Sequence, residues 1–144
     1  MRLATALVSG EQRWGVIEGS EMRLAPRSDG LPDSLLELIR AEGDLPDAAN
    51  WRACPLEELE LCAPIPQPTR NVFCLGLNYA DHAAESQGTT PQEAALPEHP
   101  IVFTKATTTV TGPESDIVLD PRVTQRLDWE VELAVVLGKG GRFI

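Results

Sequence analysis

The chain has 144 residues and a mass of 15.7 kDa, which corresponds to one domain or to one domain with a small appendage. Hydrophobic residues make up 42% and charged residues 24%, which is typical of a folded globular protein and excludes a disordered or low-complexity one. The net charge of −10 disfavours binding to nucleic acid or to an anionic membrane, because both need clustered Lys and Arg.

Neither the cysteines nor the N-terminal segment indicates a secreted or membrane protein. Cys54, Cys62 and Cys74 are odd in number and form no C-x-x-C motif, so they are interpreted as small apolar residues in a reducing compartment. The apolar stretch 3–8 has no cleavage-site pattern and predicts a strand instead of a signal peptide. No apolar run approaches the roughly 18 residues of a membrane span. We therefore expect a soluble, cytoplasmic protein.

Residues 1–63 are predicted to form a small α+β domain. Short apolar runs at 3–8, 14–17 and 22–24, separated by turns that contain glycine, predict three strands, of which the first two form a hairpin. An apolar stripe at helical spacing over 35–39 predicts a helix, with Asp33 as its N-cap and Gly43 as its C-terminal stop. Alternating prolines between 64 and 68 stiffen the chain, so we place a domain boundary near Ala63.

Residues 64–144 are predicted to be rich in strands, which makes the fold class β-rich α+β. Apolar runs predict strands at 72–75, 101–103, 117–119 and 129–137, and a turn is expected at 112–113. Between the first two strands, Asn78 is expected to cap a short helix that ends at Gly88.

Glu130 and Glu132 lie two residues apart in the last predicted strand and therefore share one of its faces. Two neighbouring carboxylates that are partly desolvated repel each other unless they are protonated, paired or bound to a cation. Mg²⁺ or Mn²⁺ is a hard cation that fits such a pair. The alternative is a strand end that reaches solvent, with both glutamates hydrated.

His82 and Glu85 lie three residues apart on the predicted short helix and are therefore neighbours on its surface. A carboxylate that accepts from one imidazole nitrogen raises the basicity of the other, as a general base requires. The alternative is an ordinary exposed His–Glu pair. Lys105 follows the strand at 101–103 and could hold a substrate carboxylate as a point charge, or it could be a surface lysine.

Three segments together, 71–85, 100–105 and 127–139, closely resemble the fumarylacetoacetate hydrolase family. The likeness extends over about residues 64–142 and is greatest to bacterial acylpyruvate hydrolases, decarboxylases and isomerases. The resemblance implies that residues 64–144 are the first part of that family's mixed β-roll. It also implies a homodimer for the full-length enzyme.

The resemblance assigns a role to each candidate residue. Glu130 and Glu132 match ligands of Mg²⁺ or Mn²⁺, and the His82–Glu85 pair matches a dyad on a lid helix that activates water. Lys105 matches a lysine near the carboxylate end of the substrate. The family's third acidic ligand would lie beyond residue 144, so we expect a truncated product that is inactive or nearly so by itself.

The expected activity is metal-dependent cleavage of a carbon–carbon bond in small anionic 2-oxo acids of the acylpyruvate or fumarylpyruvate type. Such cleavage leaves an enolate whose charge a divalent cation stabilises, while His82 activates water. Isomerisation and decarboxylation share this enolate and stay open as alternatives. So does an inactive fragment that serves as an interaction module through exposed strand edges.

Overall fold

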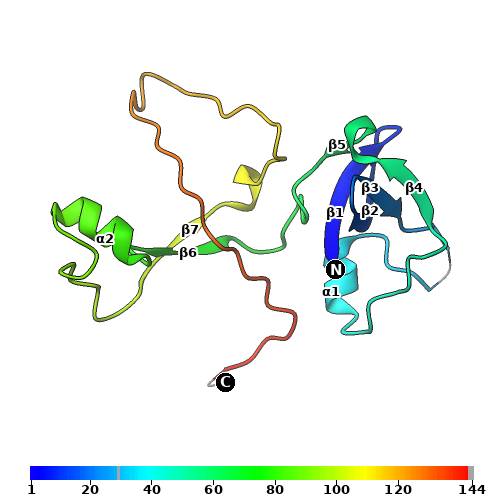
Figure 1. Cartoon of the computed structure of the whole chain (residues 1–144), viewed down its shortest axis with the longest axis horizontal. Coiled ribbons are helices and arrows are strands. Elements are labelled where there is room, and N and C mark those ends of the chain that lie inside the picture. The colour runs from blue at the N-terminus through cyan, green and yellow to red at the C-terminus, as the bar shows by residue number, and fades with distance from the viewer. Residues whose placement is uncertain (29, 143–144) are drawn as a thin grey trace. The chain divides into compact units, whose positions relative to one another are not determined.

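The computed structural model describes residues 1–28 and 30–142 (Figure 1). Phe143 and Ile144, the last residues of the predicted catalytic domain, lie outside the described part. Two compact units are present, one formed by Met1–Pro66 with Thr111–Ile144 and the other by Gln67–Val110. Within the described residues there are seven strands and two α-helices, which confirms the β-rich α+β class. The domain boundary near Ala63 stays a prediction.

The first unit is built on one antiparallel sheet of five strands, in the order β4-β3-β2-β1-β5. The three predicted strands are confirmed, whereas the two outer ones were not predicted. Ser9 and Gly10 form the two-residue turn after the first strand, and both have positive φ (52° and 82°), as a type I′ hairpin requires. The strands are β1 (Arg2–Val8), β2 (Glu11–Glu18), β3 (Glu21–Leu24), β4 (Arg52–Pro55) and β5 (Glu60–Leu61).

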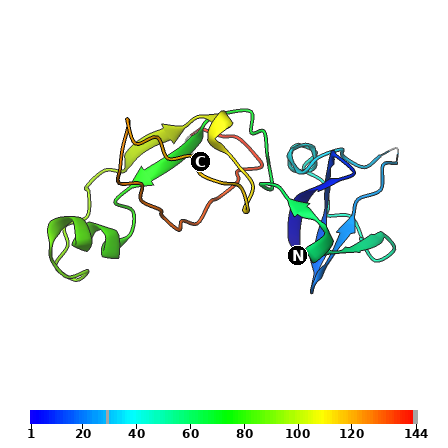
Figure 2. The same ribbon diagram turned by 90° about the horizontal axis from the view of Figure 1, so that it is seen from above.

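Both faces of this sheet carry apolar side chains, because successive residues of a strand point to opposite faces and apolar residues occupy both sets of positions. One face gathers a cluster consisting of Ala4, Ala6, Met22, Leu24 and Cys54. The other face carries Trp14 and packs against the helix α1 (Leu35–Arg40), which lies beside the sheet (Figure 2). The helix contributes Leu35 and Leu38 to this second cluster.

A close backbone approach explains the glycine in the middle of β2. A Cβ atom built on Gly15 would lie 2.2 Å from the carbonyl oxygen of Arg23 on β3. No side chain fits at that distance, so only glycine allows the two strands to pair here.

The ends of α1 differ from the prediction. Its N-cap is Ser34 instead of Asp33, because the Ser34 hydroxyl accepts from the Glu37 backbone N–H at 3.2 Å. The Glu37 carboxylate in turn accepts from the Asp33 backbone N–H at 2.9 Å, an arrangement that resembles a capping box. At the other end the helix stops at Arg40, and Glu42 instead of the predicted Gly43 takes the left-handed φ of 49°.

A buried threonine attaches the proline-rich segment to the sheet. Thr5 is 5% exposed, and its hydroxyl donates to the carbonyl oxygen of Pro64 at 2.6 Å. The backbone N–H of Cys62 donates to the carbonyl oxygen of Thr5 at 2.8 Å. The chain therefore stays bound along β1 for three residues after β5 has ended.

All three cysteines are free thiols. Cys54 and Cys74 are buried, and partial burial, followed by the charge of Glu60, raises the pKa of the Cys62 thiol. Both causes disfavour the thiolate, which agrees with the interpretation of these residues as small apolar groups.

The second unit consists of a two-stranded antiparallel sheet and one helix. The strands β6 (Val72–Gly76) and β7 (Ile101–Lys105) confirm two predictions, and the helix α2 (Ala80–Gln87) lies between them in the sequence. Gly88 ends this helix with a left-handed φ of 63°, as predicted. Its N-cap is Tyr79 instead of Asn78, without a side-chain hydrogen bond, and Leu77 shortly before it has a left-handed φ of 51°.

Two predicted strands are wrong. Segments 117–119 and 129–137 pair with no strand in the described part of the chain, although the turn expected at 112–113 is present. Trp129 and Val131 are 86% and 95% exposed. A strand needs a neighbour that bonds its N–H and C=O groups, and no described strand pairs with these apolar runs. Short 3₁₀ turns lie elsewhere in the chain, at Leu56–Glu58 and Thr107–Thr109.

No helix in the described ranges combines the length and the apolar character that crossing a membrane demands.

Candidate functional site

His82 and Glu85 lie on the exposed side of α2. The helix is alanine-rich and buries Ala83 and Ala84, which are 0% and 3% exposed. His82 and Glu85 are both exposed, and their spacing of three residues places them on neighbouring positions of the helix surface. This spacing would allow the Glu85 carboxylate to orient the His82 imidazole. The roles of His82 as base and Glu85 as its partner stay predictions.

Lys105 is the last residue of β7 and is exposed. Its Nζ lies 6.0 Å from the ring centroid of Phe103, at the limit of a cation–π contact. The strand register pairs Lys105 with Val72 at the start of β6, whereas α2 follows the other end of the hairpin (Figure 1). At about 3.3 Å per residue, Lys105 lies roughly 13 Å along the strand from that end. The structure therefore does not bring Lys105 next to His82.

Glu130 and Glu132 lie in the extended segment that was predicted as the last strand, within the first unit. Both side chains are exposed. In the described part of the chain, no three His, Cys, Asp or Glu side chains gather closely enough to hold a metal ion. Two carboxylates are suitable donors for a hard divalent cation, which needs further oxygen ligands to complete its coordination.

Hydrogen bonds that the sequence did not reveal hold the loop after α2. The side-chain amide of Gln87 donates to the Ala95 carbonyl oxygen at 2.8 Å and accepts from the Ala95 N–H at 3.0 Å. Glu93 accepts from the hydroxyls of Thr90 at 2.9 Å and Thr89 at 3.1 Å, and these bonds lower the pKa of its carboxyl. The loop is thereby attached to the C-terminal end of the helix that carries His82.

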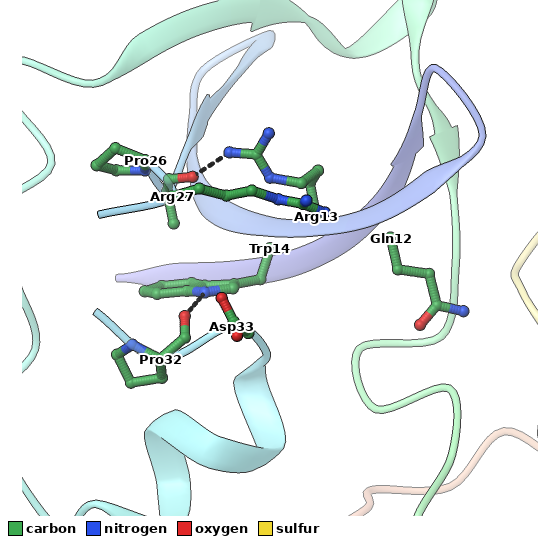
Figure 3. Close-up of a pocket in the computed structure, with 8 residues that line it drawn as sticks. Gln12, Arg13, Trp14, Pro26, Arg27, Pro32 and Asp33 are labelled. Atoms are coloured by element: carbon green, nitrogen blue, oxygen red, sulfur yellow. Dashed lines mark hydrogen bonds between the residues drawn. The ribbon is translucent and has the colours of Figure 1, made fainter. Parts of the chain in front are cut away.

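A separate pocket of about 270 Å³ lies in the first unit (Figure 3). Trp14 lies along one side of it and donates from Nε1 to the Pro32 carbonyl oxygen at 2.7 Å. The Arg13 guanidinium donates to the Ala25 carbonyl oxygen. Sequence reasoning missed this pocket, since its walls come from β2, the segment after β3 and the turn before α1. The lining residues are Gln12, Arg13, Trp14, Ala25, Pro26, Arg27, Pro32 and Asp33.

Comparison with known sequences identifies related proteins. Residues 71–144 match the family model described as fumarylacetoacetate (FAA) hydrolase C-terminal. Over 97% of its length, the chain is 39% identical to the oxaloacetate tautomerase YisK of Bacillus subtilis (strain 168). Over 67% of its length, it is 43% identical to the mitochondrial oxaloacetate tautomerase FAHD2A of Bos taurus.

A solved structure shows the same fold. Fumarylacetoacetate hydrolase from the psychrophile Exiguobacterium antarcticum matches 85% of this chain with a TM-score of 0.67 and 29% identity. The chain spans 42% of that protein, 50% of the Bacillus relative and 28% of the bovine one. These proteins are therefore two or more times as long as the chain described here.

Proposed function

The chain belongs to the fumarylacetoacetate hydrolase family, and from this premise we propose that it forms part of an enzyme that interconverts the keto and enol forms of a small 2-oxo acid such as oxaloacetate. The observation that carries this proposal is the alignment of 97% of the chain with an oxaloacetate tautomerase at 39% identity. The resemblance implied hydrolysis, with isomerisation or decarboxylation as the alternative, and the relatives that are named oxaloacetate tautomerases favour the alternative of isomerisation.

The proposed chemistry is a proton transfer. Removal of a proton from the carbon beside the keto group moves that electron pair into a carbon–carbon double bond and the carbonyl pair onto oxygen. The oxygen then takes up a proton, which gives the enol without consuming water. His82 is the proposed base, and Glu85, on the same side of α2, would keep one ring nitrogen protonated and the other free to accept.

The family's enzymes generally use a divalent metal, and two residues of this chain could contribute to its site. Glu130 and Glu132 would hold Mg²⁺ or Mn²⁺ together with further oxygen ligands. When bound, the cation supplies stabilisation of negative charge on the substrate oxygens. Lys105 would attract a substrate carboxylate as a point charge. The roles of all three residues are proposals.

The histidines allow a controlled test, because the chain has two of them. In the native-length protein, His82→Ala should slow oxaloacetate tautomerisation by about 10²- to 10⁴-fold, the usual contribution of a general base. The rate is followed by the ultraviolet absorbance of the enol, and Mn²⁺ binding is measured by calorimetry. His99→Ala, in the exposed loop before β7, is the matched control and should change neither quantity. Equal losses in the two variants, or loss of Mn²⁺ binding in His82→Ala, would contradict the assignment.

A second candidate function is hydrolysis of a carbon–carbon bond, which the similarity to the Exiguobacterium hydrolase favours. In that reaction His82 would deprotonate water for attack on the distal carbonyl of an acylpyruvate. Product identification separates the two functions, because tautomerisation leaves the carbon skeleton intact and hydrolysis releases pyruvate and a carboxylic acid. Glu132→Ala should abolish metal-dependent turnover in either case.

A further inference from the structure

The pocket beside Trp14 is a candidate site for a second ligand (Figure 3). None of the described residues that line it is a proposed base, metal ligand or substrate-binding residue. Its volume of about 270 Å³ lies just below that of pockets for drug-sized ligands and suits a small metabolite. The hydrogen bonds from Trp14 to Pro32 and from Arg13 to Ala25 join its separate walls, so the fold of the first unit holds the pocket in shape.

Arg13 gives the pocket a positive charge that no carboxylate pairs with in the described part of the chain. Its side chain is half-buried, and its guanidinium donates to the uncharged carbonyl of Ala25. A guanidinium has five N–H donors, so several of them remain for a ligand. Arg27 differs, because its guanidinium lies 2.8 Å from the Glu11 carboxylate and both side chains are exposed. The pocket thus contains one half-buried cation without an anionic partner.

Apolar rings and one carboxylate determine the remaining chemistry of the pocket. The rings of Pro26 and Pro32 and the indole of Trp14 are rigid apolar surfaces in its wall. Both arginines of the wall lie on one side of the indole, and Asp33 lies on the other side (Figure 3). A ligand with an anionic group at each end would bring its second charge toward Asp33, and like charges repel. The lining therefore favours a ligand with a single negative charge and an apolar body.

We propose that this pocket binds a small monocarboxylic acid whose carboxylate accepts hydrogen bonds from the Arg13 guanidinium. The planar guanidinium matches the geometry of a carboxylate, and such charge-assisted bonds are the strong ones. The apolar body would lie against the indole of Trp14 and the proline rings, where it is removed from water. Inorganic phosphate has the charge but no apolar body. This second ligand goes beyond the proposed reaction, and its binding is measured without turnover.

The test uses the full chain and benzoate as the probe, which carries one carboxylate on an apolar ring. Calorimetry should show one site with a Kd below about 1 mM. Benzamide has the same shape without the charge, and inorganic phosphate has the charge without the ring. Both should bind at least about tenfold more weakly. Equal binding of benzoate and either compound, or no binding of benzoate at about 10 mM, would overturn the proposal.

Nuclear magnetic resonance locates the probe on the unaltered chain. The indole N–H of Trp14 lies in the pocket wall, so its resonance should shift when benzoate is added. Trp129 is 86% exposed and does not line the pocket, so its resonance should stay in place. The chain has three tryptophans, and Trp51→Phe and Trp129→Phe assign their indole resonances by elimination. An unchanged Trp14 resonance in the presence of bound benzoate would place the ligand elsewhere and overturn the proposal.

Two variants of equal charge change test the role of Arg13. Arg13→Gln should weaken benzoate binding at least about tenfold, because it removes the charge and keeps a donor for the Ala25 carbonyl. Arg40→Gln, in the last turn of α1, is the matched control and should leave the Kd unchanged. Equal weakening by the two variants would refute the assignment of Arg13.

Asp33→Asn provides a test that does not alter the arginine. This variant should strengthen the binding of terephthalate, a dianion with a carboxylate at each end, more than that of benzoate, because it removes the charge that repels the second carboxylate. Equal effects on the two compounds would contradict the proposed orientation of the ligand.

Discussion

Replacing Trp14 with phenylalanine removes one hydrogen bond and part of one ring from the core of the first unit. Trp14 is 2% exposed, donates to Pro32 at 2.7 Å, and contacts the ring of Trp51 edge-on with centroids 5.4 Å apart. The carbonyl of Pro32 would lose its donor, which costs about 1 kcal/mol for a half-buried acceptor. The smaller ring leaves a cavity and weakens the aromatic contact, which costs about 2 kcal/mol more. We expect the free energy of unfolding to fall by about 3 kcal/mol.

Urea unfolding measures this change, with circular dichroism and tryptophan fluorescence as the two probes. Trp129 is 86% exposed, so the fluorescence change on unfolding reports mainly on the two core tryptophans. Trp51→Phe is the control, because Trp51 is half-buried, and it should cost about 1 kcal/mol. If Trp14→Phe costs no more than Trp51→Phe, the hydrogen bond to Pro32 does not stabilise the fold and the reasoning is wrong.

Two further predictions concern a close backbone approach and a carboxyl group. Gly15→Ala should lower the free energy of unfolding by about 3 kcal/mol, because its Cβ would lie 2.2 Å from a backbone oxygen. The control is Gly43→Ala in open coil, which should change the free energy of unfolding by less than about 0.5 kcal/mol in the same urea assay. The Glu93 carboxyl should titrate below its ordinary value in an NMR titration, and Thr90→Val should raise its pKa. Because the pKa of Glu93 is lower in the folded state, these hydrogen bonds stabilise the fold at pH values above the unfolded-state pKa. This stabilisation is lost as the pH falls through the folded-state pKa. An unchanged midpoint in Thr90→Val would refute the assigned cause.

Local patterns predicted the elements that are stabilised by their own neighbours in the sequence. The hairpin of β1 and β2 follows from alternating apolar residues and the turn at Ser9 and Gly10, which brings the strands into register. The end of α2 follows from Gly88, whose left-handed conformation costs glycine little. The positions of His82 and Glu85 on one helix were predictable for the same reason.

Other features depended on contacts that no local pattern contains. The N-cap of α1 is Ser34 because its hydroxyl accepts from the Glu37 backbone N–H, and the pattern alone did not distinguish Ser34 from Asp33. The strand pattern predicted that Lys105 lies at the end of a strand. Only the register of β6 and β7 shows that this is the end of the hairpin far from α2. The pocket beside Trp14 joins segments that are separate in the sequence.

The sequence by itself determined the family, the β-rich α+β class and the residue types that could serve as base and metal ligands. These features depend on motifs and on the periodicity of apolar residues, both of which are local properties of the sequence. Tertiary structure decided whether each apolar run became a strand. The run at 129–137 has the alternation of a strand and the exposure of open coil, with Val131 95% exposed. The physical reason is that the backbone N–H and C=O groups of a strand bond to an adjacent strand. A segment with alternating apolar residues therefore forms a strand only where another strand lies beside it.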